Sequence, residues 1–121
     1  MHPVFRAHVQ RLAKFLEKLD QANLKPGNEI ELNELGNLMN KIGFSGPHNK
    51  RGSARGFSHK LLKSDPMLFD GQIKIDVVHG SKVEKIRYRD FKQYLRPHIE
   101  TVLEELRKQN LIQEDDPNVQ L

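Results

Sequence analysis

The apolar residues of this chain repeat with two different periods, and the change between them restricts the fold. From Pro3 to about Ala22 they recur at intervals of three and four, which is typical of an amphipathic helix. From Gln72 to Val78 they alternate one by one, which indicates a strand with one buried face. The helical period returns from about Arg87 to Asn110. Helical ends around a strand-bearing centre predict an α+β fold.

The centre of the chain supplies the remaining expected elements. They are a helix over 31–41, a loop over 45–49, a strand over 54–62, a short strand over 67–69 and the alternating strand over 72–78. The Asp70-Gly71 pair before the last strand is a strong two-residue hairpin signal. Pro97 falls inside the C-terminal helical pattern, so we expect a kink there, or two helices with Pro97 in the first turn of the second. We therefore expect helices on one face of a small three-stranded antiparallel sheet, with an extra N-terminal helix.

Length and composition set the class of protein. A chain of 121 residues fits one domain, which we place at 1–112, with the N-terminal helix over 3–22 and the core over 31–110. The acidic segment 113–121 is expected to be disordered. The chain has no cysteine, which excludes disulfides, thiolate nucleophiles and Cys-ligated zinc. No window is apolar enough for a membrane span or a signal peptide, so we expect a soluble cytoplasmic protein without a cofactor.

Positive charge is concentrated in the middle of the chain. No acidic residue lies between Leu35 and Ser64, although the whole chain has 16 of them and a net charge of +4. The same stretch holds six cations: Lys41, Lys50, Arg51, Arg55, Lys60 and Lys63. A concentrated positive field attracts polyanions, so nucleic acid is the expected partner.

A second basic cluster follows the alternating strand, from Lys82 to Arg96, and it is diluted by Glu84 and Asp90. Charge on a helix is usually a solvated face. If the fold brings the two clusters together, they form one surface on which Tyr88 could stack on an unpaired base. The predicted nucleic-acid-binding residues are Lys50, Arg51, Gly52, Ser53, Arg55, Lys60, Lys82, Lys85, Arg87 and Tyr88.

From Leu32 to about Val102 the chain resembles HicA, the small toxins of bacterial toxin–antitoxin pairs. Three parts carry the likeness: the helix ending in Ile42-Gly43-Phe44, the basic loop entering the strand at Gly52-Ser53, and the strand 73–78 running into His79-Gly80. The resemblance implies a fold similar to the double-stranded-RNA-binding domain, cleavage of messenger RNA, and inhibition by a HicB antitoxin. Many members place a catalytic histidine directly after Gly-Ser, and here that position is Ala54.

Metal-independent RNA cleavage needs a base for the 2′-hydroxyl, an acid for the leaving oxygen and a cation for the phosphate. His79 and His59 are the predicted catalytic residues, because histidine titrates near neutrality. His48 is a further candidate, and Arg51 or Arg55 could supply the cation. Two or three scattered carboxylates and histidines give no convincing metal site. Two alternatives stay open: a non-catalytic nucleic-acid-binding module, and an interaction protein whose helix over 5–19 docks a partner.

Overall fold

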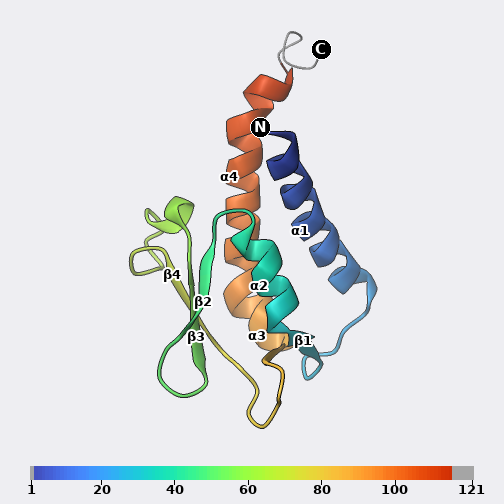
Figure 1. Cartoon of the computed structure of the whole chain (residues 1–121), viewed down its shortest axis with the longest axis vertical. Coiled ribbons are helices and arrows are strands. Elements are labelled where there is room, and N and C mark those ends of the chain that lie inside the picture. Colours follow the sequence, from blue (N-terminus) through green and yellow to red (C-terminus); the bar gives the residue numbers. More distant parts are fainter. Residues whose placement is uncertain (1, 116–121) are drawn as a thin grey trace.

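A computed structural model of the chain describes residues 2–115 and confirms the α+β class with an N-terminal helix (Figure 1). The helices are α1 (Pro3–Gln21), α2 (Leu32–Asn40), α3 (Tyr88–Asp90) and α4 (Arg96–Asp115), with a 3₁₀ turn η1 (Lys60–Leu62) and a π-helical segment η2 (Phe91–Leu95). The strands are β1 (Glu29–Glu31), β2 (Ser45–Asn49), β3 (Ala54–Ser58), β4 (Gln72–Asp76) and β5 (Lys85–Arg87).

Helix α1 forms where the period of its apolar residues predicts it. Val9, Leu12 and Leu16 are buried on one side, because residues three and four apart share a helix face. The helix lies alongside α4 (Figure 1). Near its C-terminal end Asp20 accepts two hydrogen bonds from Arg96 of α4, at 2.5 and 2.7 Å. Burial of the apolar stripe and this ion pair together join α1 to the body of the fold.

Strands β2, β3 and β4 form an antiparallel sheet in that order. Phe57 of β3 lies opposite Ile73 of β4, and all three apolar side chains Phe57, Ile73 and Ile75 are buried against the helices. Helix α2 approaches the sheet closely at Gly36, where an added Cβ would lie 3.3 Å from Pro47 of β2. The sheet therefore has a covered face, which is part of the core, and an open face on the other side.

The prediction of a loop over 45–49 is wrong, because these residues form β2. Their composition is that of a turn, with glycine and proline in sequence, but pairing with β3 overrides it. Pro47 lacks an N–H group and is tolerated because β2 is an edge strand. The register of the pairing shifts between Ser45 and His48, so a β-bulge lies at Gly46 and Pro47.

The other strand predictions are correct in part. The strand expected over 54–62 ends at Ser58, and His59 then begins η1. The short strand expected over 67–69 is reduced to a single bridge between Phe69 and Gln72. The tight turn between those two residues is confirmed: Asp70 and Gly71 have φ of 53° and 70°. Strand β4 ends at Asp76, two residues before the predicted end.

A second sheet was not expected from the sequence. Strands β1 and β5 pair antiparallel, with Ile30 opposite Ile86 and both side chains buried. Each strand has only three residues, so a single apolar position leaves no alternation to detect. This small sheet holds the start of the C-terminal helical segment beside the start of α2.

The C-terminal helical segment runs without a break from Tyr88 to Asp115. Pro97 lies in the first turn of α4, as one of the two alternatives expected, and the wider π-helical segment η2 directly precedes α4. Helix α4 also includes residues 113–115 of the predicted tail, while 116–121 lie outside the described residues. None of the helices within 2–115 combines the length and apolar character that a membrane crossing requires.

Candidate nucleic-acid interface

A row of residues crosses the open face of the sheet. His48 of β2 lies opposite Gly56 of β3, which lies opposite Lys74 of β4. Directly paired residues point to the same side of a sheet, so His48 and Lys74 flank a glycine that has no side chain. Lys50 follows β2 and lies over this glycine, since a Cβ at Gly56 would be 2.7 Å from its Cε atom. His48, Lys50 and Lys74 form the open-face cluster.

The β-bulge decides that His48 is on the open face. Ser45 pairs with Ser58, and if that register continued His48 would lie opposite Arg55, on the covered face. The one-residue shift places it opposite Gly56 instead, because side chains alternate between faces. Ser45 and His48 then share a face, and the Oγ atom of Ser45 is 2.7 Å from Nε2 of His48. The serine hydroxyl therefore fixes the orientation of the exposed imidazole.

The two lysines of the cluster carry uncompensated charge. Neither Lys50 nor Lys74 forms an ion pair with another residue of the described range. Asp76, two residues after Lys74 on the same face of β4, accepts a hydrogen bond from Ser53 Oγ at 3.3 Å. With strands about 4.8 Å apart, His48 and Lys74 are roughly 10 Å apart across the sheet, a spacing that long side chains can close around one phosphate group.

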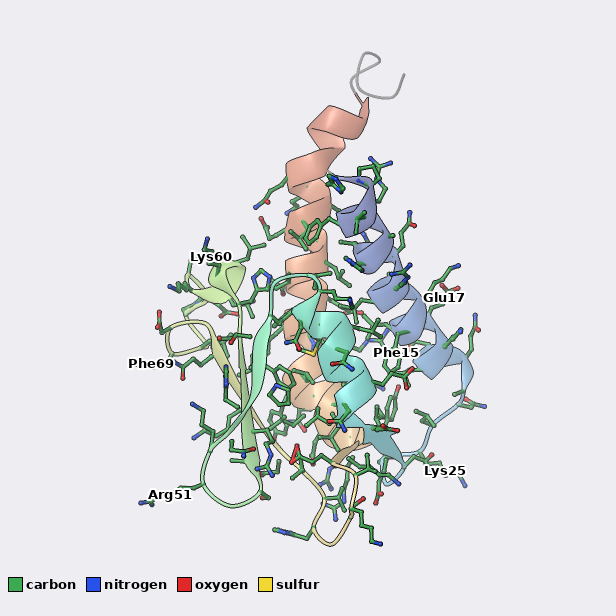
Figure 2. All side chains as sticks on the ribbon, viewed as in Figure 1. Phe15, Glu17, Lys25, Arg51, Lys60 and Phe69 are labelled. Carbon is green, nitrogen blue, oxygen red and sulfur yellow. The ribbon has the colours of Figure 1, made fainter. Side chains whose placement is uncertain are left out.

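The predicted residues Lys50, Arg51, Gly52 and Ser53 form the turn between β2 and β3. Arg51 extends into solvent at the end of this hairpin (Figure 2). Gly52 has φ of 58°, a conformation that glycine adopts without steric cost. The turn therefore presents an exposed guanidinium and two small residues beside the open-face cluster.

Arg55 is not available for phosphate binding. Its side chain is only 15% exposed and is on the covered side, where Nε and Nη2 donate to Glu84 at 2.8 and 2.7 Å. Nη1 donates to the carbonyl oxygens of Gly52 and Ala54. Arg55 therefore holds the loop after β4 against the sheet, and its predicted role in nucleic-acid binding has no support from this geometry.

His59 is buried directly before η1, and its Nδ1 accepts a hydrogen bond from the N–H of Leu61 at 3.0 Å. Nε2 must then carry the proton that it donates to the carbonyl oxygen of Ile42, also at 3.0 Å. The ring also packs edge-on against Phe44, with centroids 4.7 Å apart. Since both nitrogens have partners, the geometry gives the predicted catalytic role of His59 no support.

His79 and Lys82 lie in the loop between β4 and β5, and both are exposed. The loop begins beside the hairpin turn, because the N–H of Val77 donates to the carbonyl oxygen of Ser53 at 2.9 Å. Figure 1 shows the two loops at the same end of the sheet. His79 is therefore near the predicted binding turn, but it is not part of the row around Gly56.

Residues of the second basic cluster reach β4. A hollow beside this strand is lined by Lys74 and Asp76 together with Arg87, Arg89, Asp90 and Tyr94. Tyr88, the predicted stacking residue, is half-buried and stacks on Phe91 with centroids 6.3 Å apart. The more accessible aromatic ring is that of Tyr94, which is 49% exposed. Lys85 is half-buried on β5.

Lys60 is separated from the other predicted binding residues. It lies in η1, at the opposite end of the sheet from Arg51 (Figure 2). The acid-free stretch therefore contributes to two surfaces, one at the hairpin turn and one at η1. A single continuous surface does not form.

Within residues 2–115 no group of three or more histidines and carboxylates could hold a metal ion. Comparison of the chain with known protein families, curated proteins and solved structures finds no match.

Proposed function

We propose that this protein binds RNA across the open face of its three-stranded sheet and cleaves it without a metal ion, as the resemblance to HicA implies. The observation that carries the proposal is the open-face cluster. It combines an oriented, solvent-exposed imidazole with two unpaired lysines around a glycine. The resemblance implies a helix, three strands and a helix, and the chain has α2, β2, β3, β4 and α4 in that order, with η1, β5, α3 and η2 as additional elements between them. The resemblance further suggests a HicB-like antitoxin as its inhibitor.

In this proposal His48 is the base. When Nε2 donates to Ser45 Oγ, the lone pair is on Nδ1, which takes the proton of a ribose 2′-hydroxyl. The 2′ oxygen bonds to the phosphorus, the bond to the 5′ oxygen breaks, and this oxygen takes a proton from solvent. Lys50 and Lys74 stabilise the added negative charge on the phosphate. The products carry a 2′,3′-cyclic phosphate and a 5′-hydroxyl.

The decisive experiment is incubation of the purified protein with end-labelled RNA in the presence of a chelator. We expect cleavage with cyclic-phosphate ends, and a 10²–10⁴-fold slower reaction for His48→Ala, the usual range for loss of a general base. Ser45→Ala should slow cleavage less, since it removes only the group that orients the ring. Cleavage that His79→Ala abolishes and His48→Ala does not would assign catalysis to the loop after β4 instead.

Binding is tested separately from cleavage. The double variant Lys50→Ala/Lys74→Ala should lower RNA affinity and reduce the slope of log affinity against log salt by about 1.4, because each phosphate of a single strand that a lysine neutralises adds about 0.7 to that slope. Lys14→Ala, an exposed lysine on α1, is the matched control and should change neither quantity. Binding without cleavage in the wild-type protein would favour a non-catalytic RNA-binding module.

A further inference from the structure

Two large apolar side chains project into solvent from the loop between η1 and β4. Met67 is 85% exposed and Phe69 is 84% exposed, whereas no other large apolar residue within 2–109 exceeds 57%. Packing does not explain their position, since Leu68 between them points inward and packs against the core. Two exposed apolar residues of this size within three positions are typical of a surface that contacts another molecule.

The loop that carries Met67 and Phe69 is held in one conformation by its own hydrogen bonds. Asp65 accepts from the N–H of Met67 through its side chain at 2.9 Å and from the N–H of Leu68 through its carbonyl at 3.1 Å. The N–H of Gln72 donates to the carbonyl of Phe69 at 3.0 Å. Gly71 closes the loop against η1, where an added Cβ would lie 2.8–3.1 Å from backbone atoms. A surface fixed in this way loses little conformational entropy when it binds.

Charges beside the loop restrict what can bind. Lys60 and Lys63, in and directly after η1, are exposed beside the loop that packs on η1. Figure 2 shows Lys60 and Phe69 on the same side of the molecule. Asp70 is also exposed and directly follows Phe69. RNA or an anionic bilayer presents negative charge throughout and would meet Asp70 as well as the lysines, whereas a protein can place its carboxylates only opposite the lysines.

We propose that Met67 and Phe69 form a docking site for a partner protein that has an apolar cleft edged by carboxylates. The two side chains enter the cleft, and Lys60 and Lys63 pair with its acidic edge. The inference is independent of the RNA chemistry, because the open-face cluster supplies none of these residues.

The test begins with a photo-reactive benzoylphenylalanine at position 69 in the full chain, expressed in its native host. The same group at position 4 is the matched control, since Val4 is 57% exposed on α1. We expect a discrete protein adduct from position 69 that position 4 does not give. The protein identified in that adduct is then purified, and its affinity for the wild-type chain is measured directly.

In that direct measurement Phe69→Ser should weaken binding at least 10-fold, Met67→Ser several-fold, and Val4→Ser not at all. Lys60→Glu/Lys63→Glu should weaken binding and remove most of its salt dependence. Circular dichroism checks that each variant is folded, which exposed positions should allow. The absence of a specific protein adduct, adducts only with RNA, lipid or a second copy of the chain, or binding that Phe69→Ser leaves unchanged would overturn the proposal.

Discussion

The two faces of the three-stranded sheet use neighbouring residues of one acid-free stretch for opposite purposes. On the covered face Arg55 is neutralised by Glu84 and lies beside a core that includes Phe57. On the open face Lys50 stays unpaired and lies over Gly56. The difference follows from side-chain alternation in strands, which sends consecutive residues to opposite sides. A cation in such a stretch therefore attracts a polyanion only where it is exposed and unpaired, as Lys50 is and Arg55 is not.

The bulge in β2 places His48 on the open face, so the largest expected effect follows from substituting Gly46, which lies in the bulge. Gly46 has φ of 122°, and an added Cβ would overlap the carbonyl oxygen of Gly56. We expect Gly46→Ala to lower the free energy of unfolding by about 2–4 kcal/mol, through backbone strain and overpacking together. Urea denaturation measures this change. RNA cleavage should fall even where the variant is still folded, because His48 loses its position.

Gly52→Ala is the matched control for that variant. Gly52 also has a positive φ, of 58°, but an added Cβ there would meet no atom within 4 Å. Gly52→Ala should therefore lower the free energy of unfolding only by the cost of the left-handed backbone conformation, about 1–2 kcal/mol. Equal destabilisation by the two substitutions would show that the close approach of β2 to β3 at the bulge contributes nothing.

A smaller effect on stability should distinguish Arg55 from Lys50. Arg55→Met leaves Glu84 and two carbonyl oxygens without their donor, so we expect a loss of about 1–3 kcal/mol of stability. Lys50→Met should change stability by less than about 0.5 kcal/mol, since its charge has no partner in the described part of the chain. For RNA binding the order should reverse, with a reduced salt slope for Lys50→Met alone. A reduced slope for Arg55→Met in a folded protein would mean that the ion pair with Glu84 opens for RNA.

The period of the apolar residues predicted the elements that bury one regular face. It failed for strands that form only by pairing with a distant part of the chain. Helix α1 and strand β4 were predicted because each carries a full pattern, and the Asp70-Gly71 turn because both residues accept a positive φ. Strand β2 was missed because its residues favour a turn and gain their strand geometry only from β3. The candidate site was harder still. Nothing local reveals that Lys74 shares a face with His48, or that Glu84 reaches Arg55, since both depend on register and on a bulge.

The smallest expected effect on stability concerns the ion pair between helices α1 and α4. The hydrogen bonds from Arg96 lower the pKa of Asp20 below its ordinary value of 3.8. A carboxyl group with a lowered pKa in the folded state contributes stability above its ordinary pKa and loses it as the pH falls through the lowered value. Asp20 is 54% exposed, so the pair contributes at most about 1 kcal/mol at neutral pH. Asp20→Asn should therefore be slightly less stable than the wild type at pH 7, and the difference should shrink as the pH falls below 3.8 and disappear once Asp20 is protonated in the folded state.

Urea denaturation of both proteins from pH 7 to pH 2 measures that difference, and Glu104→Gln is the control. Glu104 pairs with Lys108 at 3.5 Å, but both side chains are largely exposed, so its removal should have no measurable effect at any pH. A difference for Asp20→Asn that is as large at pH 2 as at pH 7 would mean that packing of the side chain, and not its charge, holds α1 to α4.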